Sequence, residues 1–182
     1  MEQVDKRPKH HEREDLTGEH KLGDAGQAIL AILFGAVWLA DTFWFKYTTF
    51  LNDAVPNSIR APIGIALLVI SGYLAMSTLK IVFGEVRETP AVIREGAYKY
   101  SRHPMYVSEL LLYLGLLSIS ISLAAALVWI VAIVFLYKIC RYEERLLLAR
   151  FGDEYRKYMR EVPLWIPCLY KVHRHNAYQL VA

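Results

Sequence analysis

Two short blocks of polar and aromatic residues carry the side chains that could do chemistry. The first block is residues 96–106, with the sequence GAYKYSRHPMY. Its Pro104 suits the first turn of a helix, where a missing N–H costs no hydrogen bond. Arg102 and His103 would then lie at the positive end of the helix dipole, next to free backbone N–H groups, a place that favours a carboxylate or a phosphate. The structural alternative is an arginine that snorkels to a membrane interface beside a histidine that caps the helix.

The second block begins with two adjacent carboxylates, Glu143 and Glu144, directly after an apolar run. A carboxylate at such a boundary needs a partner, which is either Arg141 or Arg145 on the same surface or a cationic ligand. Further along, positions 147, 151, 155 and 158 hold leucine, phenylalanine and two tyrosines, an apolar stripe at helical spacing. The stripe predicts an amphipathic helix on the bilayer surface or against its neighbours. Together the two blocks suit a ligand with both a cation and a carboxylate, such as an amino-acid head group.

The elements that must position these blocks are apolar. The chain has 182 residues, of which 55% are hydrophobic and 21% charged, and its mean hydropathy is +0.24. Apolar runs cover 28–45, 61–79, a stretch from Pro104 that fades at the serines of 118–122, and 123–137. Their lengths predict an all-α integral membrane protein with four or five transmembrane helices. The serine-rich turn predicts that the last two runs form an antiparallel, C-terminal helical hairpin.

The remaining composition excludes several other classes of protein. Two cysteines exclude a disulfide-stapled scaffold, and a net charge of +3 gives no indication of nucleic-acid binding. Residues 1–25 are predicted to form a polar cytoplasmic leader, and 26–182 a single membrane domain. No metal site is predicted, because five of the histidines are scattered over the two polar ends of the chain: His10, His11, His20, His173 and His175.

The distribution of lysine and arginine predicts the orientation in the membrane. The connection 46–60 holds two basic residues and the serine turn holds none, whereas the connection 80–102 holds five and the tail after Lys138 holds more. By the positive-inside rule, both termini, the 80–102 connection and the site are predicted to be cytoplasmic. We interpret the basic excess as this topology signal rather than as specific binding of acidic lipids.

The two blocks resemble those of the isoprenylcysteine carboxyl methyltransferase and phospholipid methyltransferase superfamily. The first matches G-x-Y-x-x-x-R-H-P-x-Y at 96–106, and the second matches E-E-x-x-L-x-x-x-F-G-x-x-Y-x-x-Y-x-x-x-V-P at 143–163. The resemblance covers about residues 80–168 and includes the hairpin between the blocks. It implies methyl transfer from S-adenosylmethionine, which leaves S-adenosylhomocysteine, at a cytoplasmic pocket built from the helix ends.

Carried over position by position, the resemblance implies site residues for the cofactor and the substrate. The acidic pair would bind the ammonium of the cofactor's amino-acid moiety, and Arg102 and His103 would bind its carboxylate. Tyrosine rings would stabilise the sulfonium by cation–π attraction. Arg102 and Glu144 are the predicted catalytic residues, and Arg141 is the predicted substrate-binding residue. The predicted cofactor-binding residues are Val92, Ile93, Tyr98, His103, Pro104, Tyr106, Glu143 and Glu144.

Three positions depart from the family pattern. Ser108 stands where the family often has glycine. Family members that methylate carboxylates tend to carry an arginine shortly before the acidic pair, and Ile139 holds that register here, with Lys138 and Arg141 as stand-ins. Glu109 is an acid that the family does not require, and an ion pair with Lys138 or Arg141 across the hairpin would explain it.

The function that follows is methyl transfer to a lipophilic substrate that enters from the bilayer, most closely like isoprenylcysteine carboxyl O-methylation. The alternative is N- or O-methylation of a phospholipid or another lipid. Two further classes stay open, an NADPH-dependent membrane reductase and a non-enzymatic membrane protein. The predicted partners are this substrate and membrane lipids, and the oligomeric state is left open by the sequence.

Overall fold

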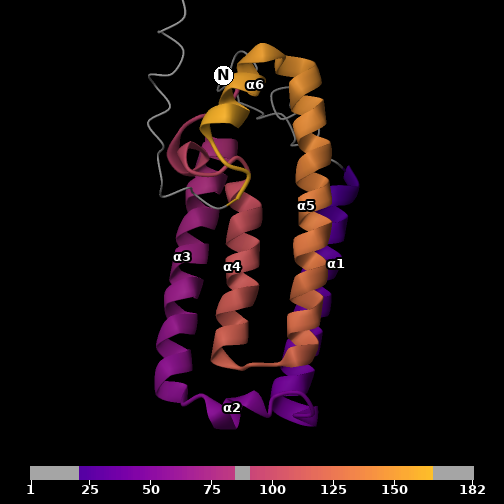
Figure 1. Cartoon of the computed structure of the whole chain (residues 1–182), viewed down its shortest axis with the longest axis vertical. Coiled ribbons are helices and arrows are strands. Elements are labelled where there is room, and N and C mark those ends of the chain that lie inside the picture. Colours follow the sequence, from indigo (N-terminus) through magenta and orange to yellow (C-terminus); the bar gives the residue numbers. More distant parts are fainter. Residues whose placement is uncertain (1–20, 85–90, 166–182) are drawn as a thin grey trace, which may run out of the picture.

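In the computed structural model, four helices of 16 or more residues lie side by side as a bundle, and a helix of nine residues covers one of its ends (Figure 1). The structure describes residues 21–84 and 91–165, so the predicted leader up to residue 20 and the five scattered histidines lie outside the described residues. Within that part there is no strand, which confirms the all-α prediction. The elements are α1 (Lys21–Leu39) with a π-helical turn (Ala40–Phe45), α2 (Leu51–Ala54), α3 (Asn57–Gly84), a 3-10 turn (Gly96–Lys99), α4 (Pro104–Ile119), α5 (Leu123–Phe151) and α6 (Asp153–Glu161).

Three helical stretches in the described part of the chain are long and apolar enough to cross a membrane, namely Ala25–Phe45, Asn57–Val82 and Leu123–Phe151. The fourth apolar helix, α4, has 16 residues and is therefore only about 24 Å long, against about 30 Å for a hydrocarbon core. The chain is thus an integral membrane protein, and a complete fourth span stays a prediction.

The hairpin of α4 and α5 is present as predicted, but two predicted boundaries are wrong. The helix α5 continues from the apolar run through the acidic pair to Phe151, because the charged stretch after residue 137 is rich in good helix formers. It ends at Gly152, whose φ of 54° and ψ of −125° suit a residue without a Cβ. The apolar stripe expected on one helix is therefore divided between α5 and α6.

The helices α3 and α4 pack closely through two glycines. A Cβ on Gly64 would lie 2.8 Å from the carbonyl oxygen of Gly115, so neither position has room for a side chain. One end of the contact is held by the Ser71 hydroxyl, which donates to the carbonyl of Ser108 at 2.6 Å. On the other side of α4, the Tyr113 ring stacks on Phe34 of α1 with ring centroids 4.3 Å apart. The short helix α4 is thus fixed between two longer ones.

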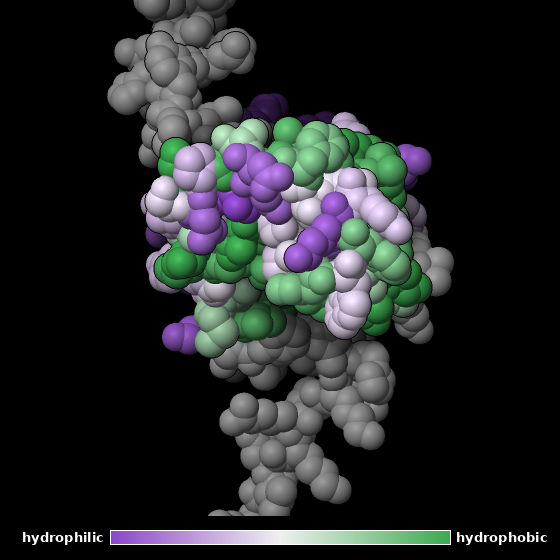
Figure 2. All heavy atoms as spheres, turned by 90° about the horizontal axis from the view of Figure 1, so that it is seen from below, coloured by the Kyte–Doolittle hydropathy of each residue, from purple (hydrophilic) through white to green (hydrophobic). Residues whose placement is uncertain are grey.

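A polar network closes the end of the bundle where α2 lies, which we call the turn end. The buried Asp41 carboxylate accepts hydrogen bonds from the Thr48 amide at 3.1 Å, from the Thr48 hydroxyl, and from the Ser122 hydroxyl at 2.6 Å. Ser122 is also the N-cap of α5, since its hydroxyl accepts from the Ala125 amide at 3.1 Å. Figure 2 looks onto this end and shows hydrophilic residues interspersed with hydrophobic ones. The network sets the hairpin's register relative to α1.

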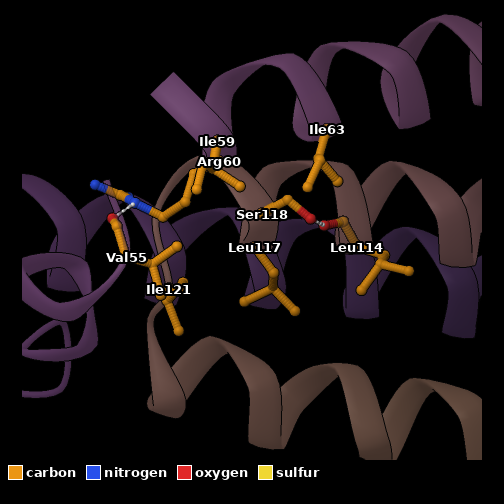
Figure 3. A pocket seen from close by; sticks show the side chains of 8 residues that line it. All are labelled: Val55, Ile59, Arg60, Ile63, Leu114, Leu117, Ser118 and Ile121. Carbon is orange, nitrogen blue, oxygen red and sulfur yellow. Dashed lines mark hydrogen bonds between the residues drawn. The ribbon is translucent and has the colours of Figure 1, made fainter. Parts of the chain in front are cut away.

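A cavity of about 250 Å³ also lies at the turn end, between α3, α4 and the loops (Figure 3). Apolar side chains such as Ile63, Leu114 and Leu117 line it. The Arg60 side chain borders it but is already bonded to carbonyl oxygens of Val55 at 2.7 Å and Ile119 at 2.6 Å. The cavity therefore offers apolar volume, and it is at the far end of the bundle from the two sequence blocks.

The glycine contact between α3 and α4 makes a testable prediction. Gly64→Ala should lower the free energy of unfolding by about 1–3 kcal/mol, because its methyl group would overlap the Gly115 backbone. Gly72→Ala on the same helix has nothing within 4 Å of its new Cβ and should be neutral or stabilising by roughly 0.5–1 kcal/mol. Unfolding of both variants in a denaturing detergent measures this, and equal effects would contradict the close contact.

Candidate functional site

The two sequence blocks are joined by backbone hydrogen bonds at the end of the bundle opposite α2, which we call the site end. The amide of Arg102 donates to the carbonyl of Pro163 at 3.0 Å, and the amide of His103 donates to that of Leu164 at 3.3 Å. The Ser101 hydroxyl also donates to the Leu164 carbonyl at 2.9 Å. Both amides therefore hold the segment that follows α6.

A buried carboxylate lies at the centre of the site end. The Glu144 side chain is 1% exposed and lies between two arginines that come from different elements. Nη1 of Arg102, which precedes α4, is 3.0 Å from Glu144 Oε1, and Nη1 of Arg141, one turn earlier on α5, is 2.7 Å from Oε2. The Arg102 side chain is 10% exposed, whereas that of Arg141 is 52% exposed. The pairing with Arg141 expected from spacing is confirmed, and Arg102 joins it from the other block.

Glu143 belongs to a second set of contacts on the same side of α5. Its Oε1 accepts a hydrogen bond from the Tyr106 hydroxyl at 2.6 Å, and its Oε2 is 3.4 Å from His103 Nδ1. The His103 and Tyr106 rings stack with centroids 5.6 Å apart and an interplanar angle of 9°. His103 Nε2 lies 3.9 Å from Glu144 Oε1, so the two sets form one cluster. Six of the predicted site residues therefore meet: Arg102, His103, Tyr106, Arg141, Glu143 and Glu144.

Three buried polar atoms of this cluster have no hydrogen-bond partner among the described residues. They are Arg102 Nε, His103 Nε2 and Glu144 Oε1, the last lying near Arg102 without the alignment of a hydrogen bond. Buried polar atoms are nearly always bonded in folded proteins, because leaving one unpaired costs about 1–3 kcal/mol. A guanidinium N–H, an imidazole nitrogen and a carboxylate oxygen left open side by side fit a polar ligand that carries charges of both signs.

The helix α6 folds back over the site end beyond Gly152. Tyr155 and Tyr158 are the buried side chains of this helix, and the Tyr158 hydroxyl donates to the carbonyl of Tyr98 at 2.7 Å. Burial raises the pKa of the Tyr155 hydroxyl, and the nearby Glu144 carboxylate raises it further. Burial also raises the pKa of Tyr158, against the opposing effect of Arg102 and Arg94. Both hydroxyls therefore stay protonated at neutral pH, and that of Tyr158 serves as a hydrogen-bond donor.

Arg94 is a residue of the site end that sequence reasoning missed. Its Nη1 is 3.1 Å from Glu161 Oε2, its Nη2 donates to the Glu154 carbonyl at 2.8 Å, and its guanidinium lies 5.3 Å from the centre of the Tyr158 ring. These contacts join the segment before the 3-10 turn to α6. No signal in the sequence separates Arg94 from the other basic residues of the 80–102 connection.

The remaining predicted residues lie at the margins of the cluster. Pro104 is buried at the start of α4, as its position in the block predicts. Val92 and Ile93 are half-buried in the segment before the 3-10 turn, and they have no polar group to join the ion pairs. Tyr98 is half-buried, and its contact with Tyr158 is through its carbonyl. These four residues surround the cluster instead of belonging to it.

Glu109 has a different partner from the expected one. The Tyr113 hydroxyl, one turn further along α4, donates to Glu109 Oε1 at 2.5 Å. The side chain of Lys138 is exposed, and Arg141 is paired with Glu144. The predicted ion pair across the hairpin is thus not formed, because its arginine is engaged by the acidic pair on its own helix.

Comparison with known proteins identifies the family. The model of the phospholipid methyltransferase family matches residues 61–154, just over half of the chain, and the chain belongs to this family. The match spans α3, the first block, the hairpin and the acidic pair, which confirms the superfamily that the two blocks predict.

Two curated relatives match less completely. The chain is 36% identical over 84 residues to the cobalt-zinc-cadmium resistance protein CzcN of Cupriavidus metallidurans, over 46% of this chain and 38% of that protein. It is 26% identical over 158 residues to the methanethiol S-methyltransferase of Crocosphaera subtropica, over 77% of this chain and 60% of that protein. The chain thus matches less than two thirds of the length of each.

The two arginines around Glu144 make a prediction about stability. Arg102→Gln should lower the free energy of unfolding by roughly 3–5 kcal/mol, because it leaves a buried carboxylate without its buried partner. Arg141→Gln is the matched control, and solvent screening of its half-exposed side chain should limit the loss to about 1 kcal/mol. Chemical unfolding of both variants in the same detergent measures the difference. Equal losses would mean that Arg102 is not the principal partner of Glu144.

Proposed function

We propose that the chain catalyses methyl transfer from S-adenosylmethionine to a lipophilic acceptor that reaches the site end from the bilayer. The observation that carries this proposal is the buried cluster of Arg102, His103, Glu143 and Glu144, which retains three polar atoms without a hydrogen-bond partner in the described structure. Membership in a family of methyltransferases and the similarity to a methanethiol S-methyltransferase support the reaction class.

The cluster fits the cofactor in its charges. S-adenosylmethionine, when bound, supplies a methyl group on a sulfonium and carries an ammonium and a carboxylate on its amino-acid moiety. Arg102 Nε and His103 Nε2 are buried and without a described partner, so they are the groups that would hold the carboxylate. Glu143 and Glu144 would hold the ammonium. The aromatic faces of Tyr98 and Tyr106 would stabilise the sulfonium by about 0.5–2 kcal/mol.

The contribution of the protein to the reaction is alignment and exclusion of water. Methyl transfer is an in-line displacement, so fixing the acceptor against the methyl group lowers the barrier by removing the need to bring the two together. The helix α6, held by Arg94 and by the bond from Tyr158 to Tyr98, covers the cluster from outside the bundle. This cover would keep water from the reacting groups.

Two acceptors agree with the proposal, and each has a residue that favours it. The family resemblance favours the carboxylate of a prenylated cysteine, for which the half-exposed Arg141 would be the binding group. A lipid amine is the alternative, and a carboxylate in α4, Glu109, favours it. For either acceptor, the excess of lysine and arginine at the site end supports a reaction on the cytoplasmic side.

The cofactor is tested by ligand binding to the purified protein. S-adenosylhomocysteine should raise the thermal unfolding temperature, because a ligand that binds only the folded state stabilises it. NADPH serves as the control for the reductase alternative and should have no effect. Stabilisation by NADPH with none by S-adenosylhomocysteine would contradict the proposed function.

The role of the acidic pair is tested by charge removal. Glu144→Gln and, separately, Glu143→Gln should weaken binding of S-adenosylhomocysteine by about tenfold or more, as expected for loss of a buried charged hydrogen bond. Glu143→Gln keeps an oxygen that can accept the hydrogen bond from the Tyr106 hydroxyl. This variant therefore tests the loss of the charge without the loss of that hydrogen bond. Titration calorimetry on variants that retain cooperative unfolding measures the affinity. Unchanged affinity in both variants would exclude the acidic pair from the cofactor site.

The acceptor class is tested with labelled methyl groups. After incubation with radiolabelled S-adenosylmethionine and a membrane extract, treatment with base releases methanol from a methyl ester and leaves an N-methyl group in place. Volatile label indicates a carboxylate acceptor, and base-stable label in the lipid fraction indicates an amine. Heat-inactivated protein is the control for transfer by the extract itself.

A further inference from the structure

The middle of α4 contains a charged residue that the cofactor cluster does not use. Glu109 is the one charged residue among the 16 of this apolar helix. Its side chain is half-buried, and its Oε1 accepts a hydrogen bond from the Tyr113 hydroxyl at 2.5 Å. Ionisable groups in apolar helices of membrane proteins are costly and mark sites of function unless a partner neutralises them.

No cation of the described chain neutralises Glu109. Its ion-pair candidates across the hairpin are Lys138, whose side chain is exposed, and Arg141, which is bound to Glu144 at 2.7 Å. Within residues 25–82 and 91–165 no lysine, arginine or histidine lies within ion-pair distance of Glu109. Tyr113 therefore donates one hydrogen bond to the carboxylate but supplies no positive charge to balance it.

Glu109 lies close to the cofactor cluster along α4. It follows Tyr106 by three positions on α4, so it lies on the adjoining face about 4.5 Å further into the bundle. The Tyr106 hydroxyl contacts Glu143, and Tyr113 is fixed by its stacking on Phe34 at 4.3 Å. Along α4, Glu109 thus lies between the cluster and the apolar middle of the bundle, and the position of its carboxylate is fixed by a packed ring.

We propose that Glu109 is a specificity-determining residue, which binds an amine or another cationic group on the acceptor and disfavours a carboxylate. This inference rests on the proposed methyl transfer and selects between its two acceptors. An ammonium group would supply the counter-charge that the described chain lacks, whereas an acceptor carboxylate would place two like charges near each other in apolar surroundings. Tyr113 acts as the positioning residue that orients Glu109.

The test uses direct binding of acceptor head groups without the cofactor. The full chain in lipid nanodiscs is titrated with dodecylamine, dodecanol and dodecanoate, which share one alkyl chain and differ in charge. The indole of Trp129 donates to the carbonyl of Leu110, next to Glu109, at 3.1 Å, so tryptophan fluorescence reports on this position. A Trp129→Phe variant identifies the part of the signal that comes from it.

The wild type should bind dodecylamine at least about tenfold more tightly than dodecanoate, a difference of about 1.4 kcal/mol. Glu109→Gln should abolish this preference, and Glu109→Asp should retain part of it. Asp53→Asn is the matched control, since it removes an exposed carboxylate at the turn end and should keep the preference. Tyr113→Phe should reduce the preference without removing the charge.

The outcomes separate this inference from the proposed function. Equal affinity of the wild type for the two charged amphiphiles, or a preference that survives Glu109→Gln, overturns the role of Glu109. If Glu109→Gln does not fold, an unchanged preference in Tyr113→Phe overturns it instead. Absence of S-adenosylhomocysteine binding by the wild type would overturn the methyl transfer alone. A lost amine preference in Glu109→Gln, with S-adenosylhomocysteine binding intact, supports both.

Discussion

The site end depends on one constraint, which is that the buried carboxylate of Glu144 must have its charge compensated. Arg141 comes from the same helix and follows from the sequence spacing, but Arg102 comes from a segment 42 positions away and must be brought to it. The hairpin returns α5 to the start of α4, and the Pro163 and Leu164 carbonyls hold the backbone of Arg102 and His103. The hairpin and these backbone hydrogen bonds together place Arg102 beside Glu144.

The buried carboxylates at the two ends of the bundle differ in how completely they are hydrogen-bonded. At the turn end, Asp41 accepts three hydrogen bonds from the loop and the hairpin, and it leaves no open atom among those described. At the site end, Glu144, Arg102 and His103 each keep a buried atom without a hydrogen-bond partner in the described structure. A network that is completely bonded stabilises one conformation, whereas an incompletely bonded one retains affinity for a ligand. The open atoms at the site end are therefore the observation on which the proposed cofactor site depends, whereas the bonded network at the turn end has a structural explanation.

Much of this arrangement could be predicted from the residue order. The four apolar runs, the serine turn and Pro104 predicted the helices and their hairpin, because hydrophobicity and backbone geometry act locally. The convergence of the two blocks followed from the expected helix ends, and the family resemblance added the assignment of cofactor and substrate roles to the residues. Contacts that depend on tertiary packing could not be predicted. They include the hydrogen bonds from the Arg102 and His103 amides to carbonyls after α6, and the ion pair of Arg94 with α6. The break at Gly152 was missed because the apolar stripe kept its helical spacing across it.

The different lengths of the two hairpin helices have a consequence for where the acceptor meets the site. Both helices start from the same serine turn, but α5 is about 20 Å longer than α4. If the turn lies at one surface of the bilayer, α4 ends before the opposite surface, and the buried Arg102 and His103 that precede it lie near that end of the helix. The anchor of the proposed lipophilic acceptor could then stay among the acyl chains while its polar end approaches these residues. Chemistry on such a molecule requires no extraction from the membrane.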